Sequence, residues 1–240
     1  MRRLAIFLVL LVALVVAGAS GADVSLVSKE VADGANGAFS DCPPDAPPAD
    51  GQICHDYVVQ YLRFDRAVDG GAIHPRSAPF RASLEIFVSR YDAASDSFDL
   101  LALEVGDTTE VTGSYDETHL SFASMHAHAP IELLSIDLAT GDAVPNGDVA
   151  VLGSMTWTAI GTDRFVFGND GPGNDGLPRH FTNGCVAANF NAHQTIRPAT
   201  LDATVPLIDG RPVAAPYRSD PEGAIFRDWF HNIVVVNQHC

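Results

Sequence analysis

Apolar and polar residues alternate with a period of two along much of this chain. The clearest example is the stretch 82–88, ASLEIFV, in which Ala82, Leu84, Ile86 and Val88 occupy every second position. Successive side chains of a β-strand point to opposite faces, so this period predicts a strand with one buried face. Further stretches of this kind cover residues 56–64, 97–105, 119–128, 131–138, 148–160, 163–168, 185–193, 199–207 and 224–237.

Turn-forming residues separate the predicted strands. They are Asp69-Gly70-Gly71, Ala139-Thr140-Gly141-Asp142, Pro145-Asn146-Gly147-Asp148, Gly161-Thr162-Asp163 and Asp209-Gly210-Arg211-Pro212. Each group supplies residues that tolerate a positive φ angle or that begin a turn. No stretch combines apolar residues at helical spacing with a cap and a stop signal. The pattern predicts an all-β fold, either an antiparallel β-sandwich or a barrel.

The first 22 residues have the three parts of a secretory signal peptide. Arg2 and Arg3 precede an apolar run over 4–17, and small residues allow cleavage after Ala19 or Ala22. The apolar run is shorter than the roughly 20 residues that cross a bilayer, so we expect cleavage and no membrane span afterwards. The predicted organisation is a signal peptide over 1–22, a Pro- and Asp-rich N-terminal arm with a disulfide loop over 23–55, and one β-rich domain over 56–240.

The chain is strongly acidic. It carries 30 acidic and 14 basic side chains, and removal of Arg2 and Arg3 leaves 12 basic ones and a net charge of −18. Such a surface repels phosphate backbones, so we expect no nucleic-acid partner. Solubility outside the cell is the simplest interpretation of this charge, which also attracts metal cations without a specific site.

The four cysteines predict disulfide bonds in an exported protein. Cys42 and Cys54 flank a Pro- and Asp-rich loop that costs little to close, so we predict this pair, and Cys185–Cys240 follows by elimination. In the chain-entropy model a closed loop of about 13 residues contributes roughly 3 kcal/mol. The alternative is a zinc site that uses Cys240 and His239, but no CxxC or CxxH spacing supports it.

The stretch SFASMHAH, residues 121–128, ends in two histidines one residue apart. His126 and His128 share one side of the predicted strand, about 6–7 Å apart, where two imidazoles can bind one metal ion. A catalytic zinc needs a third protein ligand, and His193, at the end of its own predicted strand, is the leading candidate. The other potential donors are His119, His231, Glu132 and the abundant aspartates. The alternative is that these histidines are ordinary surface residues at a strand end that Pro130 enforces.

The stretch GNDGPGNDG, residues 168–176, offers hard oxygen ligands. Its candidate ligands are Asn169, Asp170, Asn174 and Asp175. Calcium takes six to eight oxygens, so it is the ion that suits this stretch best. A glycine- and aspartate-rich calcium repeat needs tandem copies, and an EF-hand needs a closing glutamate. Because neither is present, a plain turn between strands is the alternative.

Other signals of chemistry are weak. The chain has no GxSxG sequence, and a pair of catalytic carboxylates leaves no local signature among 30 acidic residues. Trp157 and Trp229 share their predicted strand faces with apolar residues, which predicts a core position for both rather than a sugar-binding surface.

These patterns leave two functions open for a secreted, extracellular protein. The first is a non-catalytic protein that binds an extracellular or cell-envelope ligand, favoured because no catalytic constellation is visible. The second is a metal-dependent secreted enzyme centred on His126, His128 and His193. We predict no cofactor other than a calcium or zinc ion at the sites named above.

Overall fold

The computed structural model describes residues 24–43, 46–68, 78–162, 164–168, 180–183, 186–214 and 216–236. Over these ranges the protein is all-β, with fifteen strands in one sheet. In chain order they are β1 Val24–Ser40, β2 Ile53–Val68, β3 Arg81–Asp92, β4 Ser97–Thr108, β5 Val111–Tyr115, β6 Phe122–Ala127, β7 Ile131–Ile136, β8 Ala143–Val151, β9 Ser154–Ala159, β10 Phe165–Gly168, β11 His180–Asn183, β12 Val186–Ala203, β13 Leu207–Ile208, β14 Arg211–Pro212 and β15 Tyr217–Val236. None of these residues forms a helix with the length and hydropathy needed to span a bilayer.

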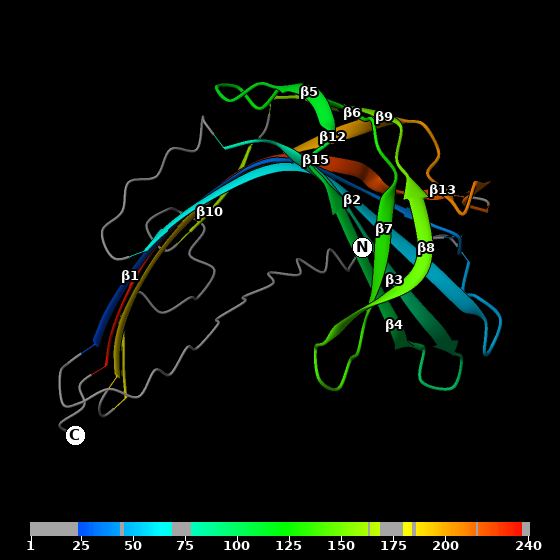
Figure 1. The fold of residues 1–240 in the computed structure, drawn as a ribbon, viewed down its shortest axis with the longest axis horizontal. Coiled ribbons are helices and arrows are strands. Elements are labelled where there is room, and N and C mark those ends of the chain that lie inside the picture. Colours follow the sequence, from blue (N-terminus) through cyan, green and yellow to red (C-terminus); the bar gives the residue numbers. More distant parts are fainter. Residues whose placement is uncertain are drawn as a thin grey trace.

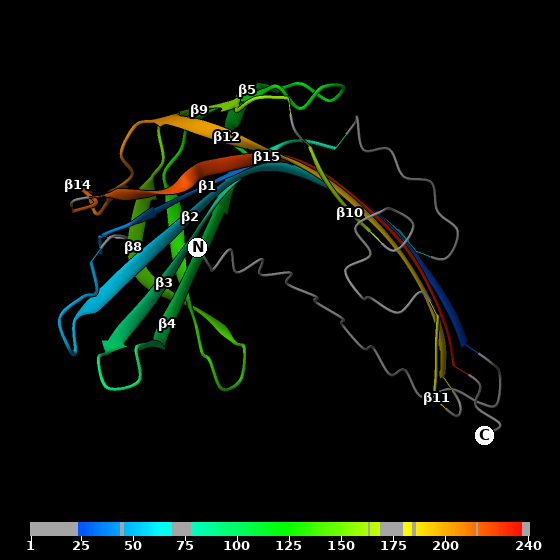
Figure 2. The ribbon, with the colours of Figure 1, turned by 180° about the vertical axis from the view of Figure 1, so that it is seen from behind.

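The sheet is antiparallel and curls into a half-barrel (Figure 1). Its strand order is β14-β13-β8-β7-β4-β3-β2-β1-β15-β12-β9-β6-β5, with β10 and β11 paired to β12. The long strands β1, β2, β12 and β15 continue past the half-barrel as an arch, which Figure 2 shows from behind. The predicted antiparallel all-β fold is therefore confirmed in the form of one curled sheet.

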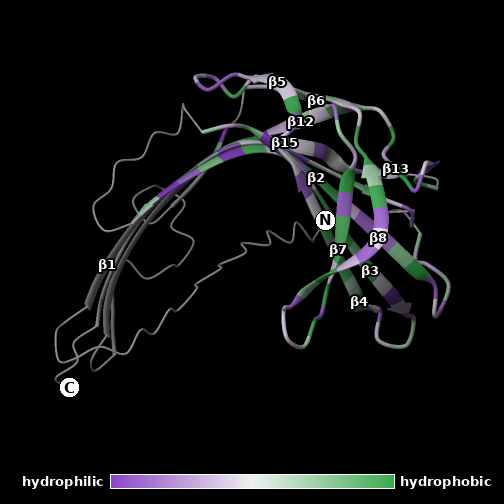
Figure 3. Cartoon of the chain, in the orientation of Figure 1, coloured by the Kyte–Doolittle hydropathy of each residue, from purple (hydrophilic) through white to green (hydrophobic). Residues whose placement is uncertain are grey.

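One face of the sheet carries the hydrophobic core. We call it the inner face and define it by Leu84, Trp157 and Ile225, which are fully buried. Along β3 the buried inner residues alternate with the partly exposed Ser83 and Glu85 of the opposite, outer face, as the sequence predicts. Figure 3 shows the same alternation of hydrophobic and hydrophilic bands along β7 and β8. This face buries Tyr57, Val59, Tyr61, Ala82, Ile86, Met125, Leu133, Leu152, Met155 and Leu201.

The two tryptophans differ in their environment. Trp157 is fully buried, and its indole N–H donates a hydrogen bond of 2.8 Å to the carbonyl of Asn36. Trp229 is 37% exposed, so its predicted core position is wrong. It lies on the arch opposite His193, where the inner face continues beyond the half-barrel core.

Residues 24–40 lie inside the sheet rather than along its outside. They form β1, which pairs with β2 on one side and with β15 on the other. The N-terminal arm expected over 23–55 is therefore not confirmed. Gly34 shows why this strand is rich in small residues, because a Cβ there would lie only 2.3 Å from the Tyr61 carbonyl oxygen and 2.8 Å from the Leu62 Cα.

Several predicted turns form as expected and others do not. Gly141, Gly161 and Gly210 adopt positive φ angles between strands. The predicted turn at 145–148 lies inside β8, next to an irregularity in its pairing with β7. The stretch 148–160 divides at Gly153, where φ is +68°. The two strands predicted over 185–193 and 199–207 are one strand, β12, which passes through Pro198 and ends at Ala203.

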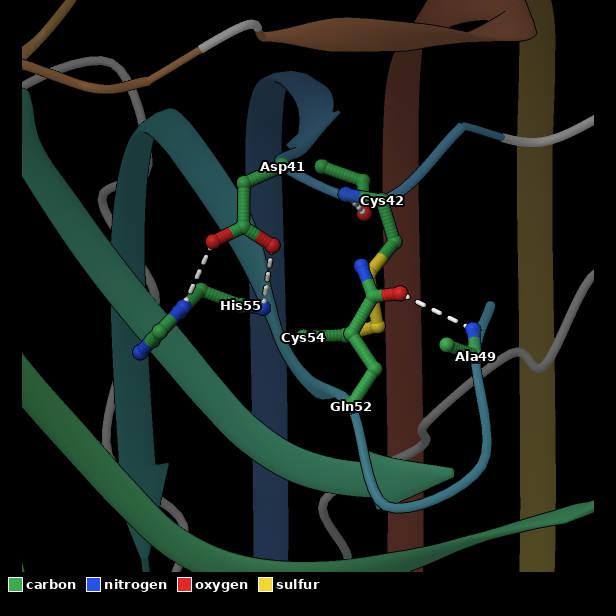
Figure 4. Close-up of a disulfide and its surroundings, with 7 residues drawn as sticks. Asp41, Cys42, Ala49, Gln52, Cys54 and His55 are labelled. Atoms are coloured by element: carbon green, nitrogen blue, oxygen red, sulfur yellow. Dashed lines mark hydrogen bonds and ion pairs between the residues drawn. A yellow bond between two sulfur atoms is a disulfide. The ribbon is translucent and has the colours of Figure 1, made fainter. Parts of the chain in front are cut away.

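Cys42 and Cys54 form a disulfide bond, as predicted (Figure 4). Their Cα atoms are 5.5 Å apart, and the bond closes the segment between β1 and β2. Cys185 and Cys240 lie outside the described residues, so the second disulfide stays a prediction.

Candidate functional site

His126 and His128 lie together on the outer face at the end of β6. Both are exposed, and their rings meet edge to face with centroids 4.6 Å apart. The Nδ1 atom of His126 lies 2.7 Å from the Ser154 hydroxyl, and Nε2 of His128 lies 2.8 Å from the Thr112 hydroxyl. Each imidazole therefore uses one nitrogen in a hydrogen bond and keeps the other for a ligand.

His193 does not join this pair. It pairs with Trp229 and shares the inner face with the buried Arg197, whereas His126 and His128 are on the outer face. The histidine pair is adjacent to the start of β9, which meets β12 at Ala203. Ala203 and His193 are separated by about 30 Å along the strand, at 3.3 Å per residue. The three predicted zinc ligands thus do not converge.

The other predicted ligands are placed as follows. His119 is exposed and lies 3.7 Å from a carboxylate oxygen of Asp116, and Glu132 is exposed on β7. The side chain of His231 and the calcium candidates Asn169, Asp170, Asn174 and Asp175 lie outside the described part. Within that part, one group of three potential metal donors is close enough to share an ion, namely Asp41, Cys42 and Cys54. Its two sulfur atoms are already joined in the disulfide.

Beside the disulfide, the Asp41 carboxylate makes two polar contacts with His55 (Figure 4). One carboxylate oxygen accepts the His55 backbone N–H at 2.7 Å, and the other lies 2.6 Å from the ring Nδ1. Tyr57 follows on the same strand face, and burial, with Asp41 as the next contribution, raises the pKa of its hydroxyl to about 12. The stacked His55 and Tyr57 rings thus lie beside the Asp41 carboxylate at the start of β2.

Glu104, which lies near His55, and Asp148, which lies near Glu104, also have perturbed pKa values. Burial and the neighbouring Asp148 raise the pKa of Glu104, although a hydrogen bond from Asn146 and the proximity of His55 oppose this. Burial and Asp209 raise the pKa of Asp148. These carboxyl groups hold their protons to higher pH than isolated ones, because burial disfavours the charged form and a second negative charge close by adds to this.

A buried ion-pair network lies where the half-barrel core meets the arch. Asp33, which is 1% exposed, accepts hydrogen bonds from Arg63 at 2.9 Å and from Arg227 at 2.6 Å. Glu117, in the segment between β5 and β6, pairs with the same two arginines. The guanidinium of Arg63 also lies over the Phe80 ring, 5.1 Å from its centroid. The network joins β1, β2, β15 and the segment between β5 and β6. Each of its four charged side chains contacts one of opposite charge.

A pocket of about 250 Å³ opens on the outer face of β2, β3, β4 and β7. It is lined by Leu62, Arg81, Ser83, Leu84, Glu85, Val105, Gly106, Asp107 and Leu134. Arg81 and Asp107 form an exposed ion pair with 3.8 Å between nitrogen and oxygen. Within the described ranges, no hydrogen bond or ion pair engages the Glu85 carboxylate. Burial raises the pKa of Glu85, since the charged form has lost water without gaining a partner.

No pattern in the sequence distinguishes Glu85 from other polar residues of an alternating strand. It occupies the position at which a solvent-facing side chain is expected, and Leu62 and Leu134, from distant parts of the chain, complete the pocket. Only pairing of β2 with β3 and of β4 with β7 brings these residues together.

Comparisons with known proteins add little to this description. No protein-family model and no curated protein matches the chain. Among solved structures, the chain is similar to an acetoacetate decarboxylase-like enzyme from Sphingomonas wittichii RW1, with 10% sequence identity and a TM-score of 0.23. That similarity covers 88% of this chain and 91% of the other. At this TM-score it carries no inference about function.

Proposed function

We propose that this is an exported, non-catalytic protein that binds a small ligand outside the cytoplasm, either free in the medium or associated with the cell envelope. The outer-face pocket carries this proposal. It combines apolar walls from Leu62, Val105 and Leu134 with a carboxylate, Glu85, that has no partner in the described structure. Convergence of a few polar groups in a mainly apolar pocket is typical of small-molecule sites. The pocket is also built on paired strands, which favours a site that is formed before the ligand arrives.

Export is supported by the sequence of the first 22 residues and by the Cys42–Cys54 bond. The acidic composition argues against a nucleic-acid partner. We also propose that Cys185 and Cys240 form a second disulfide bond. No catalytic role is assigned to the ion pairs of Asp33 or to the acidic residues near His55.

The first prediction concerns export and oxidation. When the full chain is produced in a bacterial host, we expect the exported form to begin after Ala19 or Ala22 and to contain no free thiol after denaturation. N-terminal sequencing and thiol titration measure both. A variant with Cys42→Ser and Cys54→Ser should also be exported and should lose roughly 3 kcal/mol of unfolding free energy.

The control for export is a chain that lacks residues 2–22, which should stay in the cytoplasm with its thiols reduced. An uncleaved N-terminus on full-length protein recovered only from the cytoplasm would contradict the export proposal. Free thiols at Cys185 and Cys240 in exported protein would contradict the second disulfide alone.

A second candidate function is metal-dependent, because the His126 and His128 rings are close enough to bind one ion. In this proposal the two histidines bind zinc on the outer face, and the remaining positions around the ion are open to water or substrate. His193 is not part of this site. A calcium ion bound by Asp170, Asn174 and Asp175 is a separate proposal that rests on the sequence alone.

The second prediction tests the zinc proposal by calorimetric titration of the purified full chain with zinc chloride. We expect one bound zinc, and loss of this binding in His126→Ala and in His128→Ala, because each variant removes one of two ligands. The matched control is His119→Ala, an exposed histidine on a different segment, which should bind zinc as before. Equal zinc binding by all three variants would show that the ion does not use the pair.

A further inference from the structure

We propose that the outer-face pocket binds a small organic cation, with an ammonium group against Glu85 and an alkyl body against Leu62, Val105 and Leu134. This inference rests on the proposed binding function and adds the chemical class of the ligand. It is carried by the cavity, by the lack of a partner for the carboxylate, and by the apolar residues around it.

The position of Glu85 in the sheet explains why its charge is unbalanced. Its neighbours across the pairing are Val58 on β2 and Val105 on β4, and neither carries a charge or a hydrogen-bonding side chain. The raised pKa of Glu85 agrees with this environment, since burial is the one resolved cause. A ligand that brings a positive charge replaces the water that the carboxylate has lost.

The other charged residues of the pocket, Arg81 and Asp107, do not compensate the negative charge of Glu85. Arg81 and Asp107 face each other at 3.8 Å and neutralise one another, so the pocket as a whole has one excess negative charge, that of Glu85. The net charge of −16 also raises the local concentration of cations around the whole chain. A ligand with a single positive charge therefore fits the site better than a neutral molecule or an anion.

The apolar walls favour an organic cation over a metal ion. Calcium needs six to eight oxygen ligands and magnesium keeps a shell of water, but Leu62, Val105 and Leu134 offer neither. An alkyl group would instead gain about 25 cal/mol for each Å² of apolar surface that it buries there. The volume of about 250 Å³ is smaller than the sites of roughly 300–1,000 Å³ that hold drug-sized ligands, so the ligand is small.

The third prediction uses three probes of equal chain length: pentylammonium, pentan-1-ol and pentanoate. Each is titrated into the purified full chain and followed by calorimetry and by NMR shifts. We expect saturable binding of pentylammonium, weaker binding of the alcohol by about tenfold or more, and no binding of pentanoate. Glu85→Gln should weaken pentylammonium binding by about tenfold or more and leave the alcohol unchanged.

The matched control is Glu110→Gln, the same chemical change at an exposed glutamate outside the pocket, which should bind pentylammonium like the unmodified chain. A thermal melt shows whether each variant is folded. Equal binding of alcohol and ammonium, or a Glu85→Gln variant that binds the ammonium as before, overturns the cation proposal while ligand binding in the pocket stands. If no probe binds, the cation proposal and the pocket-based binding function both fail, whereas the export result is unaffected.

Discussion

Replacement of Asp33 by alanine is expected to lower the free energy of unfolding by about 3–5 kcal/mol, because it leaves two arginines without their shared buried partner. Asp33 accepts hydrogen bonds from both Arg63 and Arg227, and 95% of Arg63 is removed from solvent. Glu117 alone cannot compensate both cations, since it is more exposed and lies 3.9 Å from Arg227. The loss is the cost of unpaired buried charge rather than the net contribution of the pair.

Urea unfolding at neutral pH measures this loss. The matched control is Asp99→Ala, which removes a carboxylate from an exposed pair with Arg90 at 3.3 Å. An exposed pair of this kind contributes about 0–1 kcal/mol. Equal losses in the two variants would mean that the Asp33 network is no more important than a surface ion pair.

Replacement of Asp228 by asparagine is expected to raise stability above neutral pH by up to about 4 kcal/mol. Burial is the main cause that raises the pKa of Asp228 from 3.8 to about 7, with a smaller contribution from Asp33, while a hydrogen bond from Gln194 opposes it. One of its carboxylate oxygens is buried without a hydrogen-bond partner. At high pH the folded protein must therefore keep a charge in a site that disfavours it.

The sign of the pH dependence follows from the direction of the pKa change. A carboxyl group whose pKa is higher in the folded than in the unfolded state binds its proton more tightly when folded. Its favourable contribution is complete below about pH 4 and is lost as the pH rises to about 7 and beyond. Asp228→Asn has no such proton to lose, so its advantage should grow across this window.

Unfolding free energies at about pH 4 and pH 8 test this expectation. The difference between Asp228→Asn and the unmodified chain should be close to zero at the lower pH and up to about 4 kcal/mol at the higher one. Asp202→Asn, at an exposed position on β12, is the control and should show no comparable change. A gain of the same size at both pH values would show that it does not come from the titration of Asp228.

The sequence predicts the strands in which large apolar residues alternate with polar ones, and it misses β1, β5 and β11. β3 is recognised because large apolar residues at 84 and 86 point into the core. β1 is missed because its middle, ADGANGA, consists of alanine, glycine, aspartate and asparagine, which are depleted in strands. At position 34 a glycine is required because the backbone around Tyr61 approaches it closely. This constraint appears only when β1 and β2 are paired.

Local patterns also predict which side chains share a face, but not which faces meet. The orientation of His126 and His128 follows from their spacing, whereas the distance of His193 depends on where β12 meets β9. Asp33 and Arg227 are 194 residues apart in the chain, and no local signal joins them. The predicted calcium stretch and the second disulfide lie outside the described residues and stay predictions.

The pairing of the first described strand with the last one has a consequence for folding. β1 and β15 are neighbours over nearly their whole length, from Val24 opposite Val236 to Ser40 opposite Tyr217 (Figure 2). The pairing of β1 with β15 therefore cannot be completed until residue 236 has been synthesised, and bringing these strands together closes a very long loop. Contacts so distant in sequence slow the rate of folding. A ribosome-bound chain that lacks β15 should accordingly leave the β15-facing edges of β1 and β12 unpaired.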